Sequence, residues 1–272
     1  MPKLSIITVN LNNKDGLINT AKSIVEQTYT DYEWIIIDGG STDGSVEVIK
    51  EYADKTDKLV YWCSEKDGGI FQGMNKGIEK ASGEYCWFLN SGDYAYKNTT
   101  LEEIFSYNFD YDIVYGDLFW QDGDKGTYES LNKNKRVYEK SYWIKFWKSL
   151  PHPSSFFKRE LINKIGGYRT ELTIMADKTL FMDAIFSYSA VCRYIPVCFS
   201  VFMADGISNH PSSVEKIRVQ TYLSNKLVFP KMYRLYNCYT FLSYYHKLYR
   251  KWWKKRKKIK HEKALTVKKE TA

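Results

Sequence analysis

Apolar runs alternate with helical patterns along the first half of the chain. Five short apolar runs are typical of buried strands: 4–9, 34–37, 59–63, 85–89 and 112–115. Apolar positions recur at helical spacing between them, which predicts four helices: 15–27, 45–52, 70–81 and 100–107. A capping box at 99–102 is expected to open the last of these helices. This alternation predicts an α/β protein with a largely parallel sheet and helices on both faces.

The second half of the chain is less regular. A turn rich in Asp and Gly at 121–126 predicts a hairpin, and the aromatic, basic stretch 138–148 suggests a surface helix or lid. The remaining expected elements are strands at 154–157 and 191–203 and helices at 160–165, 178–187 and from 214 onward. We therefore expect one α/β domain over 1–212 and a helical, aromatic and basic extension over 213–272.

The bulk composition is that of a soluble globular protein, with 44% hydrophobic and 26% charged residues. The five cysteines are scattered without CxxC or zinc-finger spacing, which favours reduced thiols in the cytoplasm. The chain shows neither a signal peptide nor a run of about 20 apolar residues that could span a bilayer. We expect a cytoplasmic protein.

The positive charge is concentrated near the C-terminus. Residues 247–260 contain nine Lys or Arg and no acid, so removing them takes the net charge from +8 to −1. Aromatic residues alternate with cations over 244–253, a pattern that suits the headgroup zone of an anionic membrane. Nucleic-acid contact fits this composition too, and a solvated tail is the plainer alternative. We favour peripheral binding to the inner face of the cell membrane.

Three acids stand at the ends of predicted elements. Asp38 follows the second strand in Ile-Asp-Gly-Gly-Ser-Thr-Asp-Gly, Asp93 follows the fourth, and Asp177 precedes a helix. Ligands of open α/β sheets bind at the carboxyl ends of the strands. Separated carboxylates there suit a nucleotide-diphosphate substrate: one acid reads the base or ribose, one holds Mg²⁺ or Mn²⁺, and one acts as general base.

Four motifs in this order resemble the family-two glycosyltransferases of the GT-A fold: 5–10, 37–44, 67–77 and 88–93. The resemblance covers roughly residues 3–205. It implies a Rossmann-like, mostly parallel sheet flanked by helices. It also implies inverting transfer of a sugar from a nucleotide-diphosphate sugar to a glycan or lipid-linked acceptor, in bacterial surface polysaccharide assembly.

The predicted nucleotide-sugar contacts lie in the first three motifs: Thr8, Asn10, Asp38, Asp67, Asn75 and Lys76. The resemblance places Thr8 and Asn10 against the nucleotide and Asp38 against the base. For Asp67 the alternative is a turn acid. For the Asn75–Lys76 pair the alternative to a diphosphate contact is a solvated helix face.

The resemblance also assigns the metal and the base. The metal motif falls on 91–93, where Gly92 leaves Asp93 as the acid for Mn²⁺ or Mg²⁺. The catalytic acid pair reads Ala176-Asp177, so Asp177 carries the role of base.

Two histidines are weaker candidates. His152 resembles a family position on the acceptor side, with a structural histidine as the alternative. His210 could approach the diphosphate or the metal, with an ordinary loop histidine as the alternative.

Two other classes of function compete with a sugar transferase. A nucleotidyltransferase would carry a Gly-x-Gly-x-Arg loop after the first strand, and residues 10–20 lack it. A degenerate, non-catalytic transferase that binds partners at the membrane fits the missing acids at Gly92 and Ala176. The chain has no P-loop, no dinucleotide fingerprint and no nucleophile motif, which argues against ATP, dinucleotides and covalent catalysis.

Overall fold

The computed structural model describes residues 1–131, 150–204, 206 and 211–230. The lid expected at 138–148, His210 and the basic run 247–260 lie outside the described residues. Residues Met1–Ser224 pack as one compact unit. The expected boundary between 212 and 213 stays a prediction.

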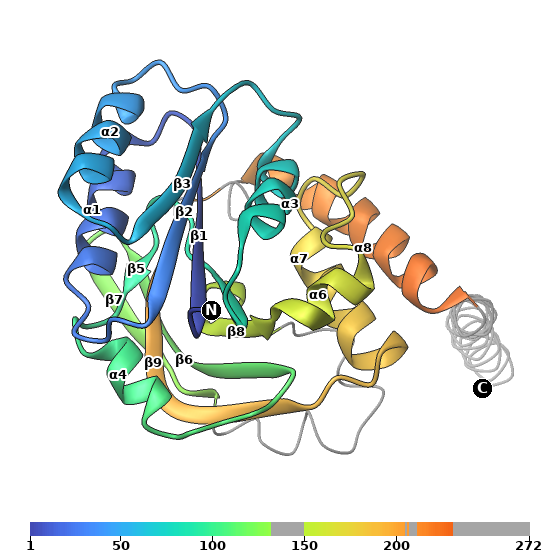
Figure 1. Ribbon diagram of the computed structural model, residues 1–272. Helices are drawn as coiled ribbons and strands as arrows, with labels where there is room; N and C mark the ends of the chain where they lie inside the picture. Colours follow the sequence, from blue (N-terminus) through green and yellow to red (C-terminus); the bar gives the residue numbers. More distant parts are fainter. Residues whose placement is uncertain (132–149, 205, 207–210, 231–272) are drawn as a thin grey trace, which may run out of the picture. The chain divides into compact units, whose positions relative to one another are not determined.

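Four parallel strands form the first half of the sheet (Figure 1), and the three helices between them cover its two faces. The strands are β1 (Leu4–Asn10), β2 (Tyr32–Asp38), β3 (Leu59–Ser64) and β4 (Tyr85–Phe88). The helices are α1 (Lys14–Val25), α2 (Ser45–Lys55) and α3 (Ile70–Lys80). All were predicted, with bounds that shift by at most three residues.

The second half of the sheet contains both parallel and antiparallel strands. The strands are β5 (Tyr94–Ala95), β6 (Ile113–Asp122), β7 (Lys125–Glu129), β8 (Ser155–Lys158) and β9 (Cys192–Met203). β8 lies antiparallel between β4 and β6, β9 runs parallel to β6, and β7 forms the predicted hairpin with β6. The order is β3-β2-β1-β4-β8-β6-β9-β5, with β7 on β6. The expected GT-A-like α/β fold is confirmed.

Alternation along the strands builds a separate core on each face of the sheet. On β1, Leu4 and Ile6 face the core shared with α1, α2 and α4 (Thr100–Phe105), while Ile7 and Val9 face the other. The second core takes apolar residues from α3, α6 (Arg159–Ile165) and α7 (Ala176–Met182). Because both faces are covered, the central strands are buried along their whole length and mostly apolar.

Two helices differ from expectation. The helix predicted over 178–187 begins at Ala176 as α7 and continues as a π-helical turn, η3 (Asp183–Ser187). The capping box at the start of α4 does not form, because the Thr99 hydroxyl donates to the Glu103 carboxylate instead of capping the helix.

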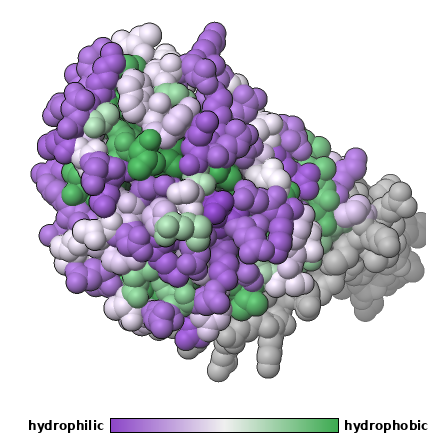
Figure 2. Space-filling view, viewed as in Figure 1, coloured by the Kyte–Doolittle hydropathy of each residue, from purple (hydrophilic) through white to green (hydrophobic). Residues whose placement is uncertain are grey.

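The described chain ends in α8 (Val214–Val228), and short 3-10 turns cover His152–Ser154 (η2) and Pro211–Ser213 (η5). None of the helices in the described ranges is long and apolar enough to cross a bilayer. Polar and charged side chains cover most of the face in Figure 2, with small apolar patches between them.

Candidate active site

Asp38 ends β2 beside the last residue of β1, Asn10, and the last residue of β3, Ser64. Its carboxylate is fully buried and accepts hydrogen bonds from Asn10 Nδ2 (2.7 Å) and Ser64 Oγ (2.6 Å). The Ser41 hydroxyl and the backbone N–H groups of Gly40 and Ser41 also donate to it, at 2.5, 3.1 and 2.8 Å. The chain itself therefore supplies five donors.

These hydrogen bonds decide the charge of Asp38. Burial acts to raise its pKa, but the hydrogen bonds from Ser41, Ser64 and Asn10 outweigh burial and hold the pKa below its ordinary value. The carboxylate is thus ionised at neutral pH and shapes the turn that follows β2. In this arrangement a direct contact from Asp38 to a base requires one of these donors to give way.

The neighbouring Asn10 offers a different contact. Its Nδ2 donates to Asp38, and its Oδ1 is buried without a hydrogen-bond partner in the described part of the chain. Such orphaned acceptors are rare in folded proteins and call for a partner. Among the described residues at this strand end, the amide oxygen of Asn10 is thus one acceptor that a ligand N–H or hydroxyl would satisfy.

The loop after β1 joins the Asp38 loop to the loop after β4. Asn12 N donates to Ser41 Oγ at 2.7 Å. On its other side, Asn13 Nδ2 donates to the Ser91 carbonyl at 3.0 Å. The segments that carry Asp38 and Asp93 therefore meet around 10–13, at the carboxyl edge where the sequence predicts a ligand.

Asp93 is nearly buried, and its Oδ1 accepts a hydrogen bond from the backbone N–H of Met203 at 3.1 Å. Thr20 fixes the loop by donating to the Asp93 carbonyl and accepting from Gly92 N. Gly92 has φ +104°, a conformation that glycine adopts readily and other residues rarely do. The backbone geometry thus explains the glycine at a position where the motif often has an acid.

Asp67 lies just before α3, and Lys76 lies on it. Asp67 Oδ1 accepts from Gly69 N at 2.9 Å, which is the turn role given as the alternative. Lys76 Nζ pairs with Glu65 at 2.9 Å on the surface. Neither contact tests the predicted donor role of these two side chains, which stays a prediction.

Asp177 stands in the first turn of α7, and Lys178 N donates to its Oδ1 at 2.7 Å. Burial raises the pKa of Asp177 to about 6, although the Lys178 N–H and ammonium act against it. Its charge also contributes, after burial, to the raised pKa of Tyr168, so the two side chains are electrostatic neighbours.

Tyr168 links Asp177 to the end of β4. Its ring centroid lies 5.1 Å from that of Phe88, the last residue of β4, and 5.5 Å from that of Phe71 on α3. Asp93 follows the same strand by five residues. Asp177 is thus connected through Tyr168 to the strand that precedes Asp93. That all three predicted acids face one pocket stays a prediction.

Comparisons with known proteins agree with this geometry. The model of the family described as Glycosyl transferase family 2 matches residues 5–166. The chain belongs to glycosyl transferase family 2. An uncharacterized glycosyltransferase of Mycobacterium tuberculosis (strain ATCC 25618 / H37Rv) is 30% identical over 217 residues, covering 78% of this chain and 80% of the relative. A PGL/p-HBAD biosynthesis glycosyltransferase of Mycobacterium bovis is 26% identical over 212 residues, covering 76% and 80%.

Solved structures of this glycosyltransferase fold align at low identity. S. aureus TarS 1-349 in complex with UDP-GlcNAc aligns with a TM-score of 0.64 at 18% identity, over 82% of this chain and 66% of TarS 1-349. The mannosyltransferase PcManGT from Pyrobaculum calidifontis, in complex with GDP-Man and Mn²⁺, gives 0.62 at 18%, over 82% and 63%. This chain thus spans about two thirds of these structures, and the likeness concerns the fold.

Two predicted contacts of this family 2 glycosyltransferase have other partners in the structure. Thr8 is fully buried, and its hydroxyl accepts from the Trp34 indole at 3.0 Å. Asn75 uses both ends of its amide on the backbone of Tyr168, at 2.8 and 2.9 Å. Thr8 therefore supports the strand below the edge, and Asn75 holds the Tyr168 loop against α3, which is a positioning role and not the solvated face considered as its alternative.

His152 is a buried, neutral histidine. Burial lowers its pKa to about 4, and its Nε2 lies 2.6 Å from the Tyr168 hydroxyl, with the ring stacked on Phe88. It contacts the same Tyr168 that neighbours Asp177, so it supports the region of the predicted base from within. The acceptor-side role stays a prediction.

The candidate ligands for a divalent metal are oxygen atoms in the loop after β4. Among the described residues, no three His, Cys, Asp or Glu side chains gather as a metal-binding group. However, Asn90 Oδ1 is buried without a partner in the same loop as Asp93. Two oxygen donors of this kind suit Mg²⁺ or Mn²⁺ when a substrate diphosphate completes the shell.

The sequence did not single out Tyr168, Ser64 or Asn90. Tyr168 and Ser64 are ordinary residue types whose importance comes from their partners: Tyr168 from Asp177 and His152, and Ser64 from Asp38. Asn90 stands out only through its buried acceptor without a partner in the described part of the chain. The signal available for Ser64 was its position at the end of β3, in register with Asp38.

Proposed function

We propose that this family 2 glycosyltransferase transfers one sugar, with inversion, from a nucleotide-diphosphate sugar to a hydroxyl group of a glycan or lipid-linked glycan. The observation that carries the proposal is the carboxyl group of Asp177, whose pKa is raised to about 6 beside Tyr168 and the end of β4. A general base works best when its pKa is near the working pH. The nucleotide sugars bound by TarS and PcManGT support the donor class.

The chemistry needs one base and no protein nucleophile. Asp177 accepts the proton of the acceptor hydroxyl while that oxygen forms a bond to the anomeric carbon. The bond from the anomeric carbon to the diphosphate breaks on the opposite face, and the diphosphate leaves with the electron pair. Attack from the opposite face inverts the configuration of the sugar.

A divalent cation would be held by Asp93 and Asn90 Oδ1 together with the donor diphosphate, and it would neutralise the charge of the leaving group. Asn10 Oδ1 would accept a hydrogen bond from the nucleotide, while Asp38 keeps the surrounding turn in place. These assignments rest on the donor chemistry of the loops that meet around 10–13.

We also propose a cytoplasmic enzyme whose C-terminal part binds an anionic membrane surface. The nine cations of 247–260 support this, since each Lys or Arg near an anionic surface contributes about 1 kcal/mol. Exposed apolar side chains on one side of α8 add apolar contact area: Val219, Tyr222 and Leu223.

A donor screen tests the function directly. UDP- and GDP-sugars are added to the full chain with and without Mn²⁺, and the melting temperature and the release of nucleotide diphosphate are recorded. A donor that binds the native state raises the melting temperature, and slow release of its nucleotide diphosphate marks a catalytic protein. Binding without release under any metal condition would instead favour the non-catalytic alternative.

A further inference from the structure

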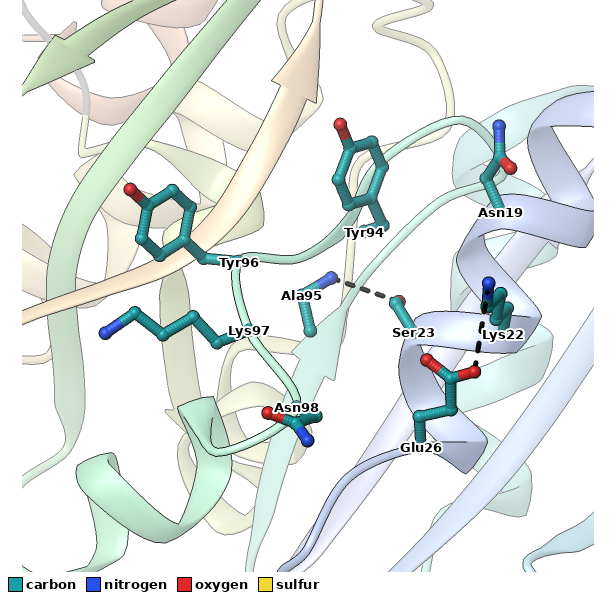
Figure 3. Close-up of a pocket in the computed structure, with 9 residues that line it drawn as sticks. All are labelled: Asn19, Lys22, Ser23, Glu26, Tyr94, Ala95, Tyr96, Lys97 and Asn98. Carbon is teal, nitrogen blue, oxygen red and sulfur yellow. Dashed lines mark hydrogen bonds and ion pairs between the residues drawn. The ribbon is translucent and has the colours of Figure 1, made fainter.

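A hollow of about 370 Å³ lies between α1 and the segment 94–98 (Figure 3). Side chains from α1 form one side and side chains from β5 and its continuation form the other. Ligand sites for small molecules commonly measure about 300–1,000 Å³, so this volume suits a single small ring. None of the predicted nucleotide, metal or base residues lines it.

The charges around the hollow are already paired. Lys22 pairs with Glu26 at 3.9 Å within α1. Lys97 pairs with Glu103 of α4 at 3.5 Å. Since each ammonium faces a carboxylate, the hollow presents no excess positive charge that would favour a phosphate or another anion.

The neutral polar groups, in contrast, are uncommitted. The side chains of Asn19, Tyr94 and Asn98 line the hollow, and none has a hydrogen-bond partner within the described ranges. Two amides and a phenol offer both donors and acceptors. Such a set matches a ligand that carries many hydroxyl groups.

Two tyrosines, Tyr94 and Tyr96, are among the residues that line the hollow. Tyr94 and Tyr96 are two positions apart on an extended segment, so both side chains leave the same side of the backbone. Tyr96 packs against Phe119 with 5.8 Å between ring centroids, and the ring of Tyr128 is 6.5 Å away. Ser23 Oγ of α1 accepts from Ala95 N at 3.1 Å, which joins the two sides of the hollow.

We propose that this hollow binds a neutral sugar residue of a glycan, at a subsite separate from the donor. Uncharged hydroxyls meet the free amides and the phenol, and the apolar face of a sugar ring packs on tyrosine. Tyr94 follows Asp93 directly, and Thr20, between Asn19 and Lys22 on α1, bonds to the Asp93 loop. A glycan bound here can extend from the transfer site, and the sugar would belong to the acceptor or product chain. In this respect the inference rests on the proposed function.

The test is saturation-transfer NMR on the full chain, with millimolar methyl glycosides of glucose, galactose, mannose and N-acetylglucosamine as probes. We expect saturation transfer to one or more of these sugars without any nucleotide present. Asn19→Ala should weaken that binding about fivefold, as expected for the loss of one net hydrogen bond. Because Asn19 is exposed on a helix and alanine favours helices, the variant is expected to fold.

Two further variants sharpen the result. Tyr94→Phe keeps the ring and removes the hydroxyl, so a smaller loss than in Tyr94→Ala separates packing from hydrogen bonding. Asn163→Ala removes the same kind of exposed amide from α6 and should leave binding unchanged. The proposal is overturned by no transfer to any of the four sugars, or by transfer that is equal in wild type and Asn19→Ala.

Release of nucleotide diphosphate from donor sugars, measured on the same proteins, separates this inference from the proposed function. Turnover without sugar binding in the hollow defeats the subsite alone. Sugar binding without turnover of any donor defeats the transferase mechanism and leaves a carbohydrate-binding site.

Discussion

At the scale of single residues, Asp177 carries the strongest chemical prediction. Asp177→Asn should lower the rate of transfer by about 10²–10⁴-fold, because the amide cannot accept the acceptor proton. Donor affinity should stay nearly unchanged, since the assigned donor contacts lie on other loops. Steady-state kinetics and donor titration measure the two effects, with the exposed Asp54→Asn as the matched control. Loss of donor affinity in Asp177→Asn would remove the base assignment.

The raised pKa of Asp177 means that its ionised carboxylate lowers the free energy of unfolding. Its folded pKa of about 6 lies above the ordinary 3.8, so the folded state holds its proton longer and stability falls as pH rises through this window. At pH 7, Asp177→Asn should therefore stabilise the protein by about 3 kcal/mol while it slows transfer. Urea unfolding should show this gain shrinking as the pH is lowered from 7 to 4. A gain that is equal at both pH values would contradict the burial of a charge.

Asp38, in contrast to Asp177, is expected to stabilise the folded protein in its ionised form. Asp38→Asn should cost about 2–3 kcal/mol, because an amide group faces donors that the carboxylate had satisfied. The folded pKa of Asp38 is lowered, so its contribution is present at neutral pH and is lost as pH falls through the carboxyl range. Ser64→Ala removes one of the five donors and should cost about 1 kcal/mol. Urea midpoints measure both, and equal midpoints for wild type and Asp38→Asn would refute the turn-holding role.

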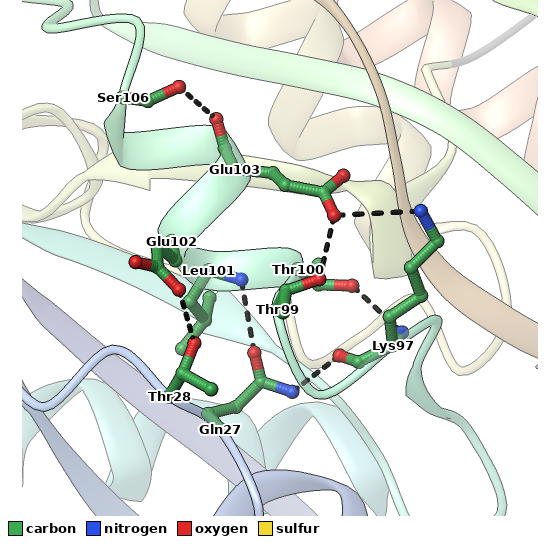
Figure 4. A network of polar contacts seen from close by, with 9 residues as sticks. All are labelled: Gln27, Thr28, Lys97, Thr99, Thr100, Leu101, Glu102, Glu103 and Ser106. Carbon is green, nitrogen blue, oxygen red and sulfur yellow. Dashed lines mark hydrogen bonds and ion pairs between the residues drawn. The ribbon is translucent and has the colours of Figure 1, made fainter.

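At the scale of elements, the start of α4 is capped by a side chain from the segment after α1 (Figure 4). Gln27, just after α1, accepts from Leu101 N at 3.0 Å and donates to the Lys97 carbonyl at 2.7 Å. It also donates to the Ser23 carbonyl at 3.0 Å. Leu101 N is one of the N–H groups that a helix start leaves without an internal partner. The predicted capping box failed because the Thr99 hydroxyl is turned to Glu103.

This arrangement gives a paired prediction. Gln27→Ala should lower the free energy of unfolding by about 2–3 kcal/mol, since it leaves a buried N–H and two carbonyls without partners. Thr99→Ala should change it by less than about 0.5 kcal/mol, because its hydroxyl caps nothing. Urea denaturation at constant pH compares the two. A larger loss in Thr99→Ala than in Gln27→Ala would reverse the assignment of the cap.

The local pattern of apolar residues predicted the helices and strands better than it predicted which residues cap or contact them. The apolar runs gave the parallel strands because both sheet faces are covered, and the start of α2 at Ser45 was predicted as the structure has it. Capping of α4 depends on Gln27, more than 70 positions from Leu101, so a window around Thr99 contained no sign of it. The π-helical turn after α7 likewise has no marker in the apolar spacing.

At the scale of the whole molecule, the order of the strands in the sheet could not be predicted from short stretches of sequence. β8 lies between β4 and β6, and β5 ends the sheet against β9. These pairings join segments about 40 to 110 residues apart. The candidate site was predicted where it follows strand ends, as with Asp38 and Asp93. The environment of Asp177 was not, because its burial and its neighbour Tyr168 come from the irregular second half.

Charge distribution along the chain separates membrane attachment from catalysis. The acids of the candidate site lie within residues 38–177, while nine cations fall within 247–260. Deleting 247–272 should release the protein from vesicles that contain anionic lipid, because about 1 kcal/mol per cation is lost. Transfer to a soluble acceptor should continue, since no predicted site residue lies in the deleted part. Co-sedimentation with anionic vesicles measures the release, and neutral vesicles and added salt serve as controls, as screening weakens such attraction. Vesicle binding that survives the deletion would assign membrane attachment to another part of the chain.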